Sequence, residues 1–401
     1  MLRLKPSSAL NGSPATAFRP AGVSSVSGSA PSSKNGPLGI NGKYVDSGRR
    51  SASRLASFAS KRCASNLLLK HDEKWAGRVS ACGYVAHQSE VELQRREHAG
   101  GEVSASLFGL VSCKSVWACP VCSARISNVR RDEMNTLLAW SRQQGHAVVM
   151  LTLTARHNSK TALAPFLDDL KEAARRLRQS RAFRGLGLVG SVAATEVTHG
   201  RNGWHPHLHL LLVLPCPSAD ALSAVEGLRD EWSRSLVKFG RDCNAAGFQV
   251  QAASAAGDYV AKFGAGEELA LGKVKLGRGG SRSPWQLLAD AAAGDKRACA
   301  LWVEFALAFK GRRQLQWSNG LKLLCGVLEV SDYQAADVEP AAEPVTLRLW
   351  PGSSFAWRSA RRRRCALLDA AETGDSLDAA EFGPTDAERW RGELSAAVVI
   401  E

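Results

Sequence analysis

The feature that most constrains the fold is HPHLH at residues 205–209, which places three of the nine histidines within five positions. The segment continues into the apolar residues Leu210–Leu214, a pattern typical of a buried strand. Side chains two apart on a strand point to the same face, so His207 and His209 project together, and His205 joins them if the strand begins early enough. Two imidazoles on one rigid strand form a preorganised site for a divalent metal.

Further strands are predicted around this one. Apolar patterns indicate strands at Ala147–Thr154, Leu188–Thr198 and Gly247–Ala252. The turn residues HGRNG separate the second of these from the histidine strand, which predicts a hairpin. Amphipathic helices are expected after the first strand and after the histidine strand. This order predicts an α+β fold with a ferredoxin-like split antiparallel sheet, in which helices cover one face and the other face stays available for a ligand.

A third metal ligand is expected from Glu196, which lies on the partner strand of the hairpin at about the height of the histidines. Imidazole and carboxylate together suit Mn²⁺ or Mg²⁺ with positions left for phosphate oxygens, and Zn²⁺ is the alternative. In the competing interpretation the histidines only hydrogen-bond within the hairpin, which fits a single histidine better than a cluster beside a carboxylate. For His157 and His199 the sequence leaves two interpretations open, a packing role and a contact with substrate.

Tyr259 is the candidate nucleophile among the four tyrosines. It lies in GDYVAKFGAG on a predicted helix after the last strand, and Lys262, three residues on, shares its face. A phenol is a poor nucleophile at its ordinary pKa of ~10, but a metal that polarises the phosphate and a nearby ammonium make attack feasible. The same Tyr and Lys without the histidine cluster would indicate packing or a surface role.

The ten cysteines are too sparse for a secreted disulfide scaffold and indicate metal ligation in a reducing compartment. Cys119 and Cys122 form a CPxC knuckle, and Cys113 lies just before it. Cys82 is the best candidate for a fourth ligand, with His98 as the runner-up. Four thiolates leave no open position, so the expected role is a structural Zn²⁺ site. Free thiols are the alternative interpretation.

The motifs resemble those of the rolling-circle replication initiators of bacterial plasmids, members of the HUH endonuclease superfamily. The matching segments are TLT at 152–154, TEVTHGRNGWHPHLHLLL at 195–212, YVAK at 259–262 and KGRRQLQWSNGLK at 310–322. The likeness extends over about residues 82–326 and includes the cysteine pattern. It implies the HUH fold, metal ligation by the two histidines that flank a hydrophobic residue, and a downstream Tyr that nicks single-stranded DNA.

One departure from the family pattern concerns termination. Relatives with a single Tyr often carry a Glu one helical turn before it, which activates water, and here that position is Ala255. Asp258 is the nearest acid. The residue that activates water is therefore open.

Charge and composition indicate a polyanionic partner and a division into regions. The 52 Lys and Arg against 38 Asp and Glu leave a formal charge of +14. Cations gather at Lys273–Arg282, at Lys310–Lys322 with Trp317 as a base-stacking candidate, and at Arg361–Arg364. The expected regions are a disordered basic arm at 1–72, a zinc-binding segment at 73–135, an HUH nicking domain at 136–270, a basic helical DNA-binding extension at 271–330 and a flexible tail at 331–401.

The sequence thus predicts a metal-dependent nicking and joining enzyme of the bacterial cytoplasm that acts on single-stranded or hairpin origin DNA. Because no GxxxxGK[ST] loop is present, a host helicase is expected to separate strands, and a host polymerase to extend the nick. No apolar run reaches the roughly 18 residues that would span a membrane. The alternatives are a single-Tyr transposase of the same superfamily and a non-catalytic zinc-dependent DNA-binding regulator.

Overall fold

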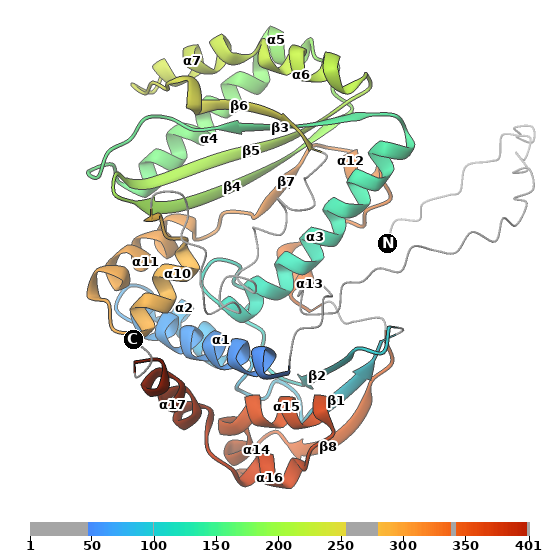
Figure 1. Cartoon of the computed structure of the whole chain (residues 1–401), viewed down its shortest axis with the longest axis vertical. Coiled ribbons are helices and arrows are strands. Elements are labelled where there is room, and N and C mark those ends of the chain that lie inside the picture. The colour runs from blue at the N-terminus through green and yellow to red at the C-terminus, as the bar shows by residue number, and fades with distance from the viewer. Residues whose placement is uncertain (1–46, 99, 254–279, 338–341, 399–401) are drawn as a thin grey trace, which may run out of the picture. The chain divides into compact units, whose positions relative to one another are not determined.

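The computed structural model describes residues 47–98, 100–253, 280–337 and 342–398, which form a mixed α+β protein with two antiparallel sheets (Figure 1). The larger sheet has the order β6-β3-β5-β4-β7 and the smaller one the order β2-β1-β8. The strands of the larger sheet are β3 (Ala147–Leu153), β4 (Gly190–Gly200), β5 (Gly203–Leu214), β6 (Phe248–Ala252) and β7 (Leu315–Trp317). Those of the smaller sheet are β1 (Glu90–Glu97), β2 (Val103–Phe108) and β8 (Val345–Pro351).

The hairpin predicted around the histidine strand is confirmed. β4 and β5 pair in register from Gly190 opposite Val213 to Gly200 opposite Gly203. Gly203 has φ +87°, and a Cβ there would lie 3.0 Å from the carbonyl oxygen of Asn158, so the turn requires glycine. This tight turn sets the register that brings the polar residues of the two strands opposite each other.

One face of the larger sheet is covered by helices α4 (Leu163–Gln179), α6 (Ser218–Glu226) and α7 (Arg229–Val237) (Figure 1). Alternate residues of β3 and β5 point into this layer, as the period of two requires. The residues that share this core are Val149, Leu151, Leu153, Leu210, Leu212 and Leu214, with Phe166, Leu170 and Trp232 from the helices.

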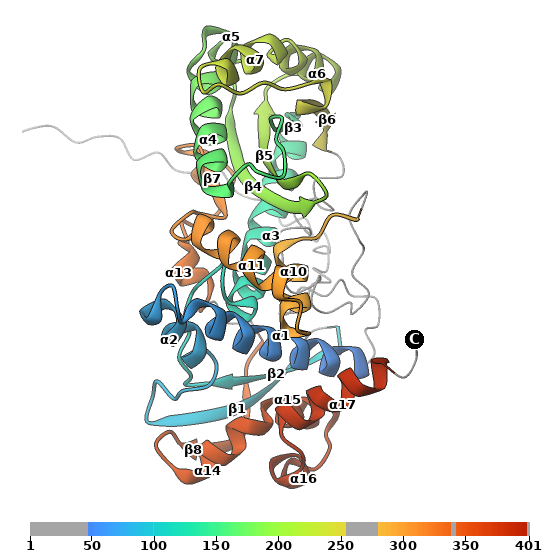
Figure 2. The same cartoon turned by 90° about the vertical axis from the view of Figure 1, so that its left-hand side faces the viewer.

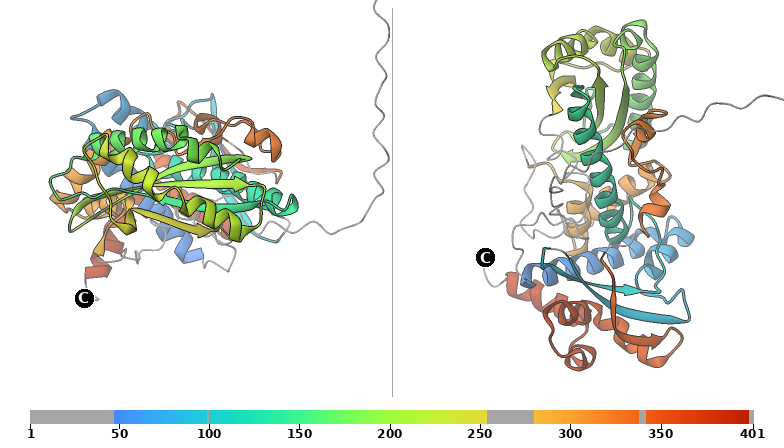
Figure 3. Two further views of the ribbon diagram at one scale, coloured as in Figure 1. Left: turned by 90° about the horizontal axis from the view of Figure 1, so that it is seen from above. Right: turned by 90° about the vertical axis from the view of Figure 1, so that its right-hand side faces the viewer.

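Helix α3 (Pro120–Gln143) partly covers the opposite face (Figure 3, right). The sequence predicted that this whole face would be open to a ligand. Leu211 and Val213 of β5 pack against Met134 and Leu137 of this helix. Covering both faces at this end explains why the apolar run of β5 is continuous rather than alternating. The histidine end of β5 lies beyond these apolar contacts. The predicted boundary at 135/136 falls inside α3.

The prediction of a flexible tail at 331–401 is wrong for most of that range. β8 lies beside β1 and pairs with it (Figure 2). Trp350 and Trp357 are buried with Val91 and Leu93. These two indoles supply apolar area that the Ala-rich and acid-rich average composition conceals. The helices of this region are α13 (Asp332–Ala335), α14 (Phe355–Ala360), η5 (Arg361–Arg363), α15 (Arg364–Thr373), α16 (Leu377–Phe382) and α17 (Asp386–Val398).

The arginine run 361–364, predicted to be part of that tail, lies in η5 and the first residue of α15. Arg364 is 4% exposed, and its Nη1 donates to the carbonyl oxygen of Gly83. Part of this charge is therefore a packing element of the fold.

The prediction of disorder over 1–72 is wrong from residue 47 onward, because Ser47–Leu68 forms helix α1. This stretch has no proline, and Ala, Leu and Arg, which favour helix, make up half of it despite its serines, whereas the Ser, Gly and Pro of the preceding residues dominate the average. Leu55 and Leu68 are buried, and Arg54 forms an ion pair with Asp369 at 2.7 Å. Residues 1–46 lie outside the described range.

Within the range 271–330, predicted to be a basic helical extension, lie helices α10 (Pro284–Ala292) and α11 (Lys296–Phe309). The remaining elements are α2 (Glu73–Ala81), α5 (Arg181–Arg184), η1 (Ala245–Gly247) and α12 (Leu321–Leu324). Among the residues described, no helix combines the length and apolarity needed to cross a membrane.

Candidate functional site

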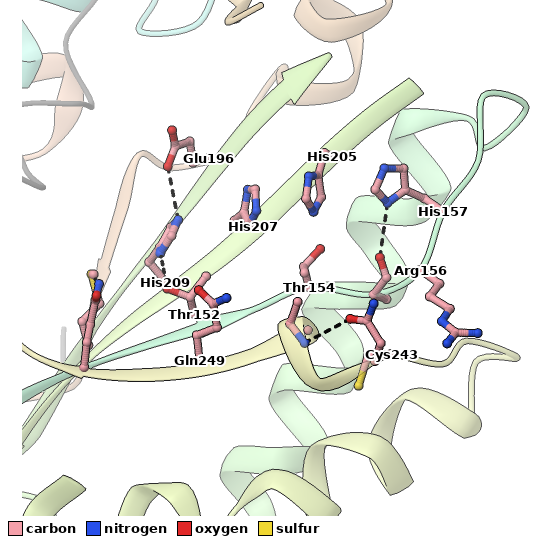
Figure 4. A pocket seen from close by; sticks show the side chains of 16 residues that line it. Thr152, Thr154, Arg156, His157, Glu196, His205, His207, His209, Cys243 and Gln249 are labelled. Atoms are coloured by element: carbon pink, nitrogen blue, oxygen red, sulfur yellow. Dashed lines mark hydrogen bonds and ion pairs between the residues drawn. The ribbon is translucent and has the colours of Figure 1, made fainter. Parts of the chain in front are cut away.

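The predicted metal ligands Glu196, His207 and His209 lie together where β4 and β5 extend beyond the α3 contacts (Figure 4). Glu196 and His207 are direct register partners. The Nε2 of His209 lies 3.2 Å from a carboxylate oxygen of Glu196, and its Nδ1 lies 3.0 Å from the hydroxyl of Thr152 on β3. Thr152 thus holds the His209 ring with Nε2 toward Glu196, a contact that sequence reasoning missed.

The histidines form a continuous row of rings (Figure 4). The ring centroids of His205 and His207 are 4.1 Å apart, and those of His207 and His209 are 5.8 Å apart. His157, which follows β3, extends the row with its ring 4.6 Å from His205. Its Nδ1 lies 3.3 Å from the carbonyl oxygen of Ala155, which leaves Nε2 for another partner when Nδ1 donates. The sequence signal for His157 was only its position three residues after the TLT segment.

His199 does not belong to this row. It is 8% exposed, its backbone bridges to Arg282, and its ring meets Trp204 edge-on at 4.9 Å. Trp204 is 2% exposed, and its indole donates to Glu304 at 2.8 Å. Both residues therefore act in packing, and Trp204 has no free face on which a base could stack.

The pKa values of the central histidines favour metal binding. Burial, aided by the neighbouring imidazoles, lowers the pKa of His207 to about 4, and burial and His157 lower that of His205 to about 4. The Glu196 carboxylate opposes both shifts. Both rings are consequently neutral at pH 7, the state in which a ring nitrogen can bind a metal.

A cavity of about 680 Å³ opens over this row. Its polar lining comes from β3, β4, β5 and β6 and from the segments that follow β3 and precede β6. The register places Gln249 opposite Thr152 and Thr152 opposite His209. This volume lies within the range of small-ligand sites. Neutral imidazole and carboxylate are donor types that divalent cations accept.

The four predicted cysteine ligands come together at a second place. Cys82 caps α2, Cys119 is the N-cap of α3, and Cys122 lies in its first turn. The Sγ of Cys122 is 3.4 Å from that of Cys82 and 3.6 Å from that of Cys113, and Cys119 is 3.8 Å from Cys82. All four thiols are buried. Their sulfur atoms all lie within 4.8 Å of one another, and they form the group of potential metal ligands found within the described ranges.

This donor set can hold a metal such as zinc. Four sulfur ligands with no room for another donor are typical of a structural tetrahedral site. Hydrogen bonding with the neighbouring thiols, that of Cys113 first, holds the pKa of Cys122 well below its ordinary value. The runner-up His98 lies elsewhere, with its Nε2 2.9 Å from the hydroxyl of Ser104 at the β1–β2 hairpin.

Several sequence predictions lie outside the described residues. These are the candidate nucleophile Tyr259, Lys262, the termination positions Ala255 and Asp258, and residues 273–279 of the basic loop 273–282. The structure therefore says nothing of their distance from the histidines.

The basic segment 310–322 is built into the fold. Lys310 pairs with Asp72, Arg312 with Asp168 at 2.8 Å, and Lys322, 4% exposed, with Glu133 at 3.2 Å. Trp317 of β7 is half-buried and packs against the core beneath α3. These contacts give the segment a structural role that its charge alone did not predict.

Comparison with known proteins identifies the central part of the chain. Residues 105–218 match the family described as "Replication protein". This span contains Cys113, Cys119 and Cys122 together with Glu196 and the HPHLH segment. The resemblance to rolling-circle replication initiators is thereby confirmed.

Similar proteins are known from Streptomyces and Bacillus. "Protein rep" of Streptomyces lividans is 30% identical over 27% of this chain and 30% of its own length. "Neomycin resistance protein" of Streptomyces cyanogenus is 29% identical over 35% of this chain and 41% of its own length. "Protein rep" of Bacillus amyloliquefaciens is 28% identical over 38% of this chain and 46% of its own length. The chain thus spans less than half the length of each relative. No solved structure matches it.

Proposed function

We propose that this chain, which resembles rolling-circle replication initiators over its central segment, nicks and rejoins single-stranded origin DNA of a plasmid. One observation carries the proposal: Glu196, His207 and His209 face one cavity inside the segment that matches the replication-protein family. The strand order β6-β3-β5-β4, with α4 and α6–α7 as the connecting helices, supports the ferredoxin-like arrangement of an HUH nicking domain.

The residues of the site have three roles: some hold the cation, one orients a ligand, and one attacks the phosphate. Glu196, His207 and His209 hold Mg²⁺ or Mn²⁺, which supplies polarisation of the scissile phosphate. Thr152 fixes the ring of His209 so that Nε2 points toward Glu196, where it could serve as a ligand. His205, the fourth predicted ligand, lies next in the row, where its neutral ring would be available to the phosphate or the cation.

Tyr259 is the proposed nucleophile. Its phenolic oxygen attacks phosphorus, the bond to the 3′ oxygen breaks, and the departing oxygen takes a proton to become a free 3′-OH. The 5′ side of the break stays linked to Tyr259 as a phosphotyrosine. Lys262 contributes positive charge near the phosphate. Attack of a 3′-OH on the phosphotyrosine reverses these bond changes and rejoins the strand.

The cysteine site and the partners complete the proposal. Zn²⁺ on Cys82, Cys113, Cys119 and Cys122 fixes α2 to the start of α3, the helix that packs on the catalytic sheet. A host polymerase extends the 3′-OH and a host helicase separates the strands in the bacterial cytoplasm. The positive net charge of the chain favours binding to the DNA backbone.

The test is cleavage of a single-stranded oligonucleotide that carries the origin, with Mn²⁺ present. His207→Ala and His209→Ala should lose cleavage because metal binding fails, whereas His199→Gln, a buried histidine outside the row, should keep it. Cleavage that persists in both row variants, or that needs no divalent metal, contradicts the proposal.

A further inference from the structure

Lys61, on α1, is a buried ammonium group without an acidic partner. It is 3% exposed, and its Nζ donates to the carbonyl oxygens of Ser80 at 3.1 Å and Cys82 at 2.5 Å. Nowhere in the described part of the chain does a carboxylate form an ion pair with it. A charge buried without a counter-charge is strongly unfavourable, so the fold must supply negative charge in some other form.

The cysteine cluster is that source. Cys82, whose carbonyl accepts from Lys61, is one of its four thiols. The ammonium of Lys61 therefore lies against the backbone of a ligand residue, whose sulfur is negatively charged when it binds a metal.

We propose that Lys61 is the internal counter-cation of the four-cysteine metal centre. A divalent metal with four thiolates carries a net charge of −2 in a cluster that packs among Trp75, Val79 and Ile126. The ammonium offsets part of that charge without touching the metal, so Lys61 is a positioning residue. This inference rests on the proposed occupancy of the site by zinc.

Two further cations bind the backbone of the same loops. Arg78 donates to the carbonyl oxygen of Cys113 at 2.9 Å, and Arg364 donates to that of Gly83. Arg78 is exposed, so water screens its charge. Lys61 is the buried cation that donates to a ligand residue itself, and it is the one whose removal should affect the centre most.

The charge of Lys61 has opposite effects in the two states of the centre. With zinc bound, the ammonium faces a dianion and stabilises it. Without zinc the thiols can take up protons, and the ammonium then has no counter-charge. Removal of the charge should therefore destabilise the loaded protein and be neutral or stabilising for the metal-free protein.

The experiment compares Lys61→Met and Lys61→Arg with Lys322→Met in the full chain. Lys322 is a matched control because it is 4% exposed but pairs with Glu133, away from the cysteines. Zinc transfer to a chromophoric chelator and zinc per chain are measured. Lys61→Met should bind zinc ~10- to 100-fold more weakly, Lys61→Arg should stay closer to the wild type, and Lys322→Met should not change zinc binding.

Thermal unfolding with zinc and with chelator gives the second measurement. Lys61→Met should lower the unfolding temperature of the loaded protein only. Lys61→Gln, which keeps a hydrogen-bond donor, gives the same comparison if Met does not fold. Wild-type zinc affinity in both neutral variants, or an equal loss in Lys322→Met, overturns the role of Lys61. Absence of zinc from the wild-type protein instead overturns the zinc site itself.

Discussion

Replacing Trp357 with Ala tests whether the C-terminal region is part of the folded protein. Trp357 is 1% exposed, and its ring lies 5.8 Å from that of Trp350 in the core shared with Val91 and Leu93. Truncation of a buried Trp to Ala costs about 3–5 kcal/mol. Because α14 has six residues and can shift toward the cavity, we expect the lower end, ~3 kcal/mol.

Urea unfolding followed by far-ultraviolet circular dichroism measures this loss without depending on tryptophan emission. Phe355→Ala is the matched control, since Phe355 lies in the same helix and is 78% exposed. Its effect should stay within about 0.5 kcal/mol. If Trp357→Ala costs no more than Phe355→Ala, the buried position of Trp357 and the packing of the region are wrong.

Three further predictions concern the two sites. His207 takes up a proton near its ordinary pKa of 6.5 in the unfolded chain, but only near pH 4 in the folded chain, where its pKa is about 4. Its contribution to the free energy of unfolding is therefore fully present above pH 6.5 and is lost as the pH falls. In His207→Gln the decrease in the free energy of unfolding between pH 7 and pH 5, measured with urea, should be smaller by up to ~2 kcal/mol, whereas in His87→Gln, at an exposed site, the decrease should equal that of the wild type. Cys119→Ser should lose zinc and thermal stability, and full zinc content by elemental analysis would contradict this. Thr152→Val should weaken Mn²⁺ binding ~10-fold or more, which a Mn²⁺ titration of cleavage will measure.

The parts of the fold that the sequence predicts are those set by local pattern. The turn around Gly203 and the period of β4 and β5 specify the hairpin, and the register then brings Glu196 opposite His207. The CPxC knuckle likewise identifies Cys119 and Cys122, because one helix start presents both thiols. Each of these features arises from residues close in sequence.

The parts that the sequence does not predict depend on distant contacts. β8 finds its partner β1 more than 200 residues away, and the averaged composition of the tail hides the buried Trp350. His157 joins the histidine row only because the segment after β3 passes beside β5. Lys61 is a basic residue in a Ser-rich stretch, and its burial beside the thiols comes from packing alone.

The most direct test of the central claim is the covalent adduct with DNA. The wild-type protein, incubated with Mn²⁺ and a single-stranded origin oligonucleotide labelled at its 3′ end, should carry the label through a denaturing gel, and mass spectrometry should place it on Tyr259. Tyr259→Phe should form no adduct, whereas Tyr84→Phe, beside the cysteine site, should form it normally. An adduct that persists in Tyr259→Phe, or a wild-type protein that forms none on its own origin, would contradict the account.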